Sequence, residues 1–506
     1  MKSFGIWIIS PSSYEDTGRL FQFRWLLMIP PIFGVMRALI NQVAQILGVS
    51  FEIICVNDRL ERGEKYIQEI IDNKSYIKKL IFISAKTFEL PRAIDIARRL
   101  KRANIDVVIG GIGVTLADWK IYEILKNEGI SFNIGEGEET IPKIVTDFVN
   151  NSLKLLYWQR SFVDLSKAPF PDIPDVIGDG YKHGLNPMAG IDTSEGCPFG
   201  CSFCCVTLLR GREMLPHRAR SIGGVIDWVE RTHKLGLPIM FLDDNFRRSP
   251  NYRQLLQELI VLNERLGKKL RIFAQLDTAI SPSDVRDLAF AGINQVYLGV
   301  ESLDLDNLQA SNKKQNNPEN YQKLVEEFHK YKIKVDAGWI TGWPNQKAKS
   351  IQKEARLMAS KFDIVTPFDL VPFPGTKDYS EAVQNNEIVD WDPNNYDTRH
   401  YVRKLYNMSP EEALVEIRKG FSIIYSFKHA LSGSPGLRYE VFRDTIYCKI
   451  LVFLGNMKIK RPYQIIMDGI PYFLPPFVMR PADSYRGEPL TSKDLARKEV
   501  CLQSML

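Results

Sequence analysis

Short apolar runs alternate with amphipathic stretches along the first 150 residues of the chain. In one of the amphipathic stretches, Met36, Leu39, Val43 and Ile46 recur at helical spacing. The apolar runs predict strands at residues 4–10, 50–56, 79–84, 105–109 and 131–134. Strands that alternate with helices are typical of a parallel, doubly wound sheet, so we predict a Rossmann-like α/β domain over residues 1–150.

A second alternation of the same kind extends from residue 186 to residue 375. It predicts strands at residues 190–193, 239–242, 270–276, 295–300, 334–340 and 363–370. Each of these strands ends in polar residues or in a loop suited to binding a ligand. Because the carboxyl ends of barrel strands converge on one face, we predict a TIM-like barrel with its site on that face.

Two further regions complete the chain. Residues 151–185 contain prolines at positions 169, 171 and 174, which predict an extended linker between the two α/β units. Residues 376–506 predict a mostly helical C-terminal region that shapes the substrate pocket, with helices at 410–429 and 439–454. The last residues, from Arg480 onward, are polar, and we expect them to be loosely packed.

Composition narrows the class of protein. A chain of 506 residues, 45% apolar and 25% charged, is expected to form two or three globular domains. A formal charge of +6 is small for this size and predicts no nucleic-acid partner. Seven cysteines are too few for a disulfide scaffold, and the first nine residues lack a signal-cleavage pattern, so we expect a cytoplasmic protein.

Two apolar segments raise the question of a membrane. Residues 21–48 and 451–479 are both interrupted by charged residues and prolines, so neither supplies the ~20 apolar residues that a span requires. Core packing is the simplest reading of both segments. For the second, peripheral contact with a membrane and a pocket for an apolar, lipid-like substrate remain open alternatives.

The chemistry is concentrated in a loop that follows the first predicted barrel strand. Cys197, Cys201 and Cys204 are separated by three and then two residues, and Cys205 follows directly, so its side chain should point elsewhere. Soft thiolates select zinc, copper(I) or iron–sulfur clusters. A structural zinc site needs four closed ligands, usually as two distant pairs, and no second pair exists here. Three thiolates on a [4Fe–4S] cluster leave one iron open, which we favour over zinc or unligated thiols.

This spacing, with Phe203 before the last cysteine, resembles the radical S-adenosylmethionine (SAM) superfamily. The resemblance implies a [4Fe–4S] cluster held by Cys197, Cys201 and Cys204, whose open iron binds SAM and generates a 5′-deoxyadenosyl radical. It also implies a partial (β/α)6 barrel and a reductase or flavodoxin-type electron donor. The residues that the resemblance assigns to SAM are Phe203 at the adenine, Asp243, Asp244 and Asn245 at the amino group, and Gln275, Asp277 and Glu301 at the ribose and carboxylate.

The first domain carries a second resemblance. Gly-Gly at 110–111, followed by Gly-Glu-Gly-Glu at 135–138, is similar to the cobalamin-binding domain fused ahead of many radical SAM cores. The resemblance implies cobalamin at the carboxyl ends of the strands, near Ser84, Gly110, Gly111, Gly135 and Glu136. The Asp-x-His-x-x-Gly motif that supplies an axial histidine is absent. Either the cobalt has no histidine ligand or the domain has lost its cofactor.

Together these patterns predict a cobalamin-dependent radical SAM enzyme that methylates an unactivated carbon of a small molecule. A radical cyclase or oxidoreductase, with or without cobalamin, is the second hypothesis. A non-catalytic iron–sulfur redox sensor is the third, and the polar strand ends argue against it. The six histidines form no cluster, and His217, in the basic loop after the cysteines, is the one nearest the predicted site.

Overall fold

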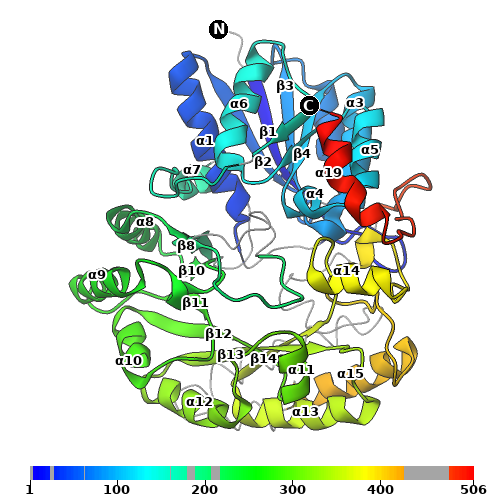
Figure 1. The fold of residues 1–506 in the computed structure, drawn as a ribbon. Helices are drawn as coiled ribbons and strands as arrows, with labels where there is room; N and C mark the ends of the chain where they lie inside the picture. Colours follow the sequence, from blue (N-terminus) through cyan, green and yellow to red (C-terminus); the bar gives the residue numbers. More distant parts are fainter. Residues whose placement is uncertain are drawn as a thin grey trace.

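The computed structural model describes residues 4–22, 28–61, 63–159, 161–178, 188–206, 217–424, 426 and 478–505. Two parallel sheets dominate it, one above the other in Figure 1. The fold is therefore the predicted pair of α/β units. The predicted helix at 439–454 and most of the apolar segment 451–479 lie outside the described residues.

The first sheet has six parallel strands in the order β2-β1-β3-β4-β5-β6. The strands are β1 (Phe4–Ser10), β2 (Phe51–Asn57), β3 (Lys79–Ser84), β4 (Asp106–Gly110), β5 (Ser131–Ile134) and β6 (Leu156–Trp158). The last lies beyond the predicted boundary at residue 150. The order 2-1-3-4-5 is that of flavodoxin-like folds, in which ligands bind at the carboxyl ends of the strands.

Helices cover both faces of this sheet because its strands are apolar on both sides. Ile6 and Ile8 of β1 face α1 (Pro31–Leu47) and α6 (Gly137–Val149), whereas Trp7 and Ile9 face the opposite layer. That second layer contains α2 (Lys65–Asp72), α3 (Leu90–Arg102), α4 (Ile112–Leu116) and α5 (Trp119–Asn127). The alternation of side chains along each strand thus builds two separate cores.

The second sheet is also parallel and six-stranded, in the order β14-β13-β12-β11-β10-β7. Its strands are β7 (Ala189–Ile191), β10 (Ile239–Phe241), β11 (Ile272–Leu276), β12 (Ile293–Glu301), β13 (Lys334–Thr341) and β14 (Ile364–Asp369). The helices around it are α8 (Ile222–Lys234), α9 (Tyr252–Arg265), α10 (Pro282–Phe290), α11 (Leu305–Ala310), α12 (Tyr321–Lys330) and α13 (Ala348–Lys361). All six predicted strands are present, and they follow one another across the sheet as in a partial barrel.

The two units share an apolar core. One continuous cluster of buried side chains runs from the α1 face of the first sheet to the interior of the second. The linker helix α7 (Ile173–Gly178) contributes Ile173 and Val176 to this cluster. Trp228 of α8 donates its indole N–H to the carbonyl of Pro171 at 3.0 Å. The proline-rich linker is therefore packed between the units.

The C-terminal region contains α14 (Lys377–Gln384), α15 (Pro410–Ile424), which packs along α13, and α19 (Arg497–Gln503), which returns to α5 of the first domain. The expectation of a loose end from Arg480 onward is wrong. Arg480 pairs with Asp392 at 2.6 Å, and Tyr485 and Leu502 are buried in the core of the first domain. The pattern misled because only one face of this segment is apolar. Among the described residues, no helix combines the length and apolar character needed to cross a membrane.

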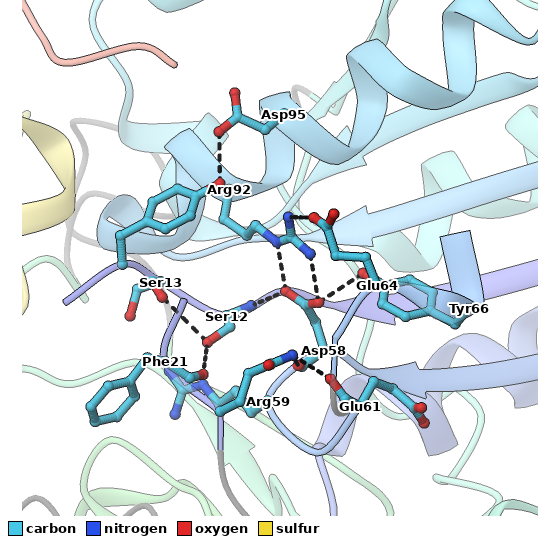
Figure 2. A network of polar contacts seen from close by, with 12 residues as sticks. Ser12, Ser13, Phe21, Asp58, Arg59, Glu61, Glu64, Tyr66, Arg92 and Asp95 are labelled. Atoms are coloured by element: carbon cyan, nitrogen blue, oxygen red, sulfur yellow. Dashed lines mark hydrogen bonds and ion pairs between the residues drawn. The ribbon is translucent and has the colours of Figure 1, made fainter. Parts of the chain in front are cut away.

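A buried ion pair between Asp58, after β2, and Arg92, on α3, holds the loop after β1 in place. Figure 2 shows Asp58, directly after β2, at the centre of this network. Its carboxylate accepts hydrogen bonds from Arg92 Nε and Nη2, both at 2.9 Å, from Tyr66 Oη at 2.8 Å and from Ser12 N at 3.0 Å. Burial alone would raise the pKa of Asp58, but Arg92 and these hydrogen bonds outweigh it and hold the pKa below its usual value.

Asp58→Ala should lower the free energy of unfolding by about 3–5 kcal/mol, because it leaves the fully buried Arg92 without its partner. Asp58 has a depressed pKa in the folded state. Its stabilisation is therefore present above the unfolded pKa of about 3.9 and is lost as the pH falls through the folded value. The stability difference between wild type and variant, measured by thermal melting, should shrink below pH ~4. The exposed Asp72→Ala is the control, and an equal loss in both variants would contradict the role of the pair.

Candidate functional site

The cysteine loop leaves the barrel at the carboxyl end of β7 and lies on the side of the barrel that faces the first domain. It begins with β8 (Ser194–Glu195), which pairs antiparallel with β9 (Arg218–Ala219). In Figure 1, β8 lies between the two large sheets. The cysteines therefore occupy the position at which barrels bind their ligands.

Two other segments, at Asp244 and at residues 311–312, fix the shape of this loop. Gly196 has φ +110° and donates its N–H to Asp244 Oδ2 at 2.9 Å. Ser202 N donates to the carbonyl of Ser311 at 3.1 Å, and Asn312 Nδ2 donates to the carbonyl of Gly200 at 2.9 Å. Backbone groups of the loop are thus satisfied by residues far apart in sequence, which leaves its thiols to bind a ligand.

The three thiols of the motif are partly buried, free and close enough to interact electrostatically. Burial raises the pKa of each thiol, most strongly that of Cys204. A cationic metal centre would therefore be needed to hold them as thiolates. Within the described ranges, no three His, Cys, Asp or Glu side chains lie close enough to hold a single metal ion. Three soft thiolates from one loop suit an iron–sulfur cluster.

A buried lysine beside the cysteines was not anticipated from the sequence. Lys313 and Glu301 form an ion pair, and the Lys313 ammonium lies 5.8 Å from the centre of the Phe203 ring. Burial alone would lower the pKa of Lys313, but Glu301 and the thiols of Cys201 and Cys204 outweigh it and raise the pKa. Lys313 is therefore a fixed positive charge next to the thiols. In the sequence it stands in a run of polar residues typical of solvated loops, so no local pattern revealed its burial.

Glu301 itself has a conformation that few residues other than glycine adopt. Its φ is +63°, and the pairing of β12 with β13 shifts register between Leu298 and Glu301. Asn316 stabilises this bend by donating from Nδ2 to the carbonyls of Gly299 and Val300, both at 2.8 Å. Backbone strain of this kind gathers at functional sites and directs the carboxylate toward Lys313.

Three of the residues predicted to bind SAM have their carboxylates occupied by internal partners, and for Glu301 that partner is Lys313. Asp243 accepts hydrogen bonds from Thr193 N at 2.9 Å, Thr193 Oγ1 at 2.7 Å and Ser194 Oγ at 2.6 Å. Asp277 accepts from Arg248 Nε at 2.6 Å and from Asn245 Nδ2 at 3.1 Å. Burial raises the pKa of Asp243 to about 6. Both aspartates thus hold neighbouring segments in place, and their contact with SAM stays a prediction.

Four further residues predicted to bind SAM lie around the mouth of the barrel. Asp244 is exposed at the mouth of the barrel, and Gln275 is partly exposed at the end of β11. Asn245 is buried beside Cys197, and its Oδ1 has no hydrogen-bond partner among the described residues. Phe203 packs edge-on against Trp343 at 6.2 Å. His217 Nε2 lies 3.2 Å from Ser194 Oγ, so this histidine supports the entry to the cysteine loop.

At the edge of the first sheet, the predicted glycines allow close backbone packing. Gly111 has φ +93°, and a Cβ there would lie 2.7 Å from the carbonyl oxygen of Ala85 and 3.0 Å from Ser84 Oγ. Gly135 has φ +92° and would meet Gln159 in the same way. At Gly110 a Cβ would make only an ordinary contact with Asn133. Close packing against neighbouring protein atoms thus requires glycine at Gly111 and Gly135, and their predicted contact with cobalamin stays a prediction.

Glu136, predicted to bind cobalamin, joins the first domain to the barrel. Arg218 of β9 donates to both of its carboxylate oxygens, at 2.9 Å for Oε2, and to Glu195 Oε2 at 2.7 Å. The same guanidinium donates to the carbonyl of Val163 in the linker at 2.8 Å. The side chain of Arg218 is only 9% exposed. One arginine therefore connects the first sheet, the linker and the strand that leads into the cysteines.

The chain is similar to known proteins in sequence and in fold. Residues 191–358 match the sequence profile of the Radical SAM superfamily. The chain is 26% identical over 357 residues to bacteriochlorophyllide d C-12(1)-methyltransferase of Chlorobaculum tepidum, a match that covers 68% of this chain and 76% of the relative.

Two solved structures share the fold. TsrM from Kitasatospora setae, a radical S-adenosylmethionine methyltransferase solved with cobalamin and a [4Fe–4S] cluster, superposes with a TM-score of 0.61 at 16% identity. That match covers 88% of this chain and 99% of TsrM. OxsB, a cobalamin-dependent SAM radical enzyme solved with aqua-cobalamin and SAM, gives a TM-score of 0.62 at 13% identity. It covers 99% of this chain and 79% of OxsB.

These findings confirm two predictions from the sequence. The barrel with its cysteine loop, over residues 191–358, is a radical SAM domain, which makes the chain an enzyme. The arrangement of an N-terminal doubly wound sheet before the barrel is that of both solved structures.

Lys313→Met should make the midpoint potential of the reconstituted cluster more negative, because it removes a buried positive charge that favours the reduced form. Spectroelectrochemistry measures this shift, and iron analysis establishes that the cluster is retained. The adjacent, exposed Lys314→Met is the matched control. The same potential in both variants would show that Lys313 does not act on the cluster.

Proposed function

We propose that this radical SAM enzyme transfers a methyl group, carried by cobalamin, to an unactivated carbon of a small-molecule substrate. The observation that carries the proposal is the placement of the cysteine loop opposite the carboxyl edge of a flavodoxin-like sheet, with Arg218 joining the two. Two ligand-binding edges that face each other suit a reaction that uses two cofactors on one substrate.

The names and contents of the related proteins support this reading. The relative from Chlorobaculum tepidum is a methyltransferase, and TsrM and OxsB were solved with cobalamin. When bound, the cluster and SAM supply a carbon radical that removes a substrate hydrogen, and cobalamin supplies the methyl group. The protein contributes binding, orientation and exclusion of water.

Each part of the site has a distinct task in this proposal. Cys197, Cys201 and Cys204 hold the cluster, and Lys313 with Glu301 sets the charge beside it. Asp243 keeps the entry to the cysteine loop in place through Thr193 and Ser194. Asp244, Asn245, Gln275 and Phe203 line the barrel mouth where SAM would bind. The three thiols form no disulfide, so they can bind the cluster.

Two further features of the proposal concern the enzyme's surroundings. Reductive cleavage of SAM consumes an electron, so a one-electron protein donor of the reductase or flavodoxin type is the partner that this chemistry requires. A cluster held by thiolates persists in a reducing compartment, so we expect the enzyme in the cytoplasm. The substrate is a small molecule, and an apolar one suits the apolar C-terminal segment of the sequence.

The decisive experiment is anaerobic reconstitution with iron, sulfide and hydroxocobalamin, followed by metal analysis and incubation with methyl-deuterated SAM. We expect about four irons and about one cobalt per chain, and deuterated methyl in the product of the accepted substrate. Iron without cobalt would contradict the methyl transfer and favour a radical cyclase or oxidoreductase.

Cys204→Ala should lose the bound iron and the formation of 5′-deoxyadenosine, because two thiolates cannot hold a four-iron cluster with one open site. Cys205→Ala is the control, since it removes the adjacent thiol that the motif does not include. Iron analysis and product chromatography measure both. SAM cleavage retained in Cys204→Ala, or lost equally in both variants, would contradict the assignment of the ligands.

A further inference from the structure

Three buried polar atoms lack hydrogen-bond partners where the first domain meets the barrel. They are Asn133 Oδ1, Gln159 Oε1 and Arg218 Nε, each unpartnered within the part of the chain that the structure describes. Asn133 is 7% exposed, Gln159 9%, and the side chain of Arg218 9%. Buried polar atoms nearly always have partners, so three orphans at one junction indicate that something else supplies the bonds.

The three side chains belong to one group around Gly135 and Glu136. Asn133 Nδ2 donates to the carbonyl of Gly135 at 3.4 Å, and a Cβ at Gly135 would lie 3.7 Å from Gln159 Oε1. Gln159 Nε2 donates to Glu136 Oε2 at 3.3 Å, the same oxygen that Arg218 Nη1 contacts at 2.9 Å. The three side chains therefore meet at one spot, at the carboxyl ends of β5 and β6.

Internal hydrogen bonds fix which atoms remain open. The Gln159 amide nitrogen donates to the carbonyl of Ser161 at 2.8 Å as well as to Glu136, so its oxygen is the end left over. Asn133 is held in the same way through its nitrogen. Arg218 uses Nη1 and Nη2 on Glu136 and Glu195, which leaves Nε. The spot thus offers two acceptors and one donor.

The charge at this spot selects against an anion. Glu136 and Glu195 carry two negative charges and Arg218 one positive charge, so the group is negative by one. A carboxylate would meet this negative charge and two carbonyl-type oxygens. A neutral primary amide would donate its N–H groups to Asn133 and Gln159 and accept from Arg218. The edge of a parallel α/β sheet is also where such a ligand binds.

We infer that Asn133, Gln159 and Arg218 form a recognition site for the primary amides on the rim of the corrin ring. This inference rests on the proposed function and names residues that hold the cofactor in addition to the small residues of the edge. Because Arg218 also pairs with Glu195, which immediately precedes the cysteine loop, a corrin bound here is held at a fixed position relative to the cluster.

Equilibrium binding of hydroxocobalamin to the cluster-reconstituted full chain tests the site. Gln159→Leu and Asn133→Leu should each weaken binding by about three- to tenfold, the loss expected for one neutral hydrogen bond. Gln68→Leu, an exposed glutamine on α2 of the same domain, is the matched control and should leave binding unchanged. Iron content and melting temperature establish that each variant is folded.

A second measurement uses the wild-type protein with a changed ligand. Hydroxocobalamin derivatives in which one rim amide is hydrolysed to a carboxylate should bind more weakly for at least one position on the ring. Gln159→Leu and Asn133→Leu should reduce that discrimination. Tight binding by the wild type, with both variants and all derivatives bound equally well, would overturn the inference and assign the open bonds to water. Failure of the wild type to bind hydroxocobalamin would instead overturn the cobalamin part of the proposed function.

Discussion

One buried guanidinium, that of Arg218, holds the first domain against the loop that carries the cysteines. Glu136 and Glu195 come from different domains and would repel each other without it. A planar fork of five donors can serve both carboxylates and a linker carbonyl at once, which the single ammonium of a lysine cannot do. Removing these charges from water costs free energy, so the ion pairs contribute mainly to structural specificity. They hold the two edges that would bind cofactors in one defined arrangement.

Much of the fold follows from patterns that are local in the sequence. The strands of both sheets are short apolar runs, buried on both faces, and their alternation with helices leaves little freedom in topology. The cysteine motif is equally local, because its spacing alone predicts three thiols in one loop. The same holds for Gly111 and Gly135, whose positive φ angles require glycine whatever the ligand.

The remaining parts of the site depend on contacts between residues far apart in the chain. Lys313 reads as a surface lysine until β12 bends at Glu301 and brings the two charges together. Glu136 looks like a cofactor residue in its motif, yet its carboxylate is taken by an arginine on β9. Asp243 likewise ends a strand in the expected way but is surrounded by Thr193 and Ser194. The periodicity of the sequence predicts the strand or loop on which a residue lies. The partner of its side chain depends on the tertiary fold.

The return of residues 478–505 to the first domain has a consequence for how the protein is made. Tyr485 and Leu502 complete a core whose other members are synthesised hundreds of residues earlier. While the ribosome is still translating the barrel, that part of the first domain stays uncovered and open to chaperones. The first domain, although synthesised before the barrel, reaches its final packing only after residues 478–505 have been synthesised, so its maturation is coupled to synthesis of the barrel.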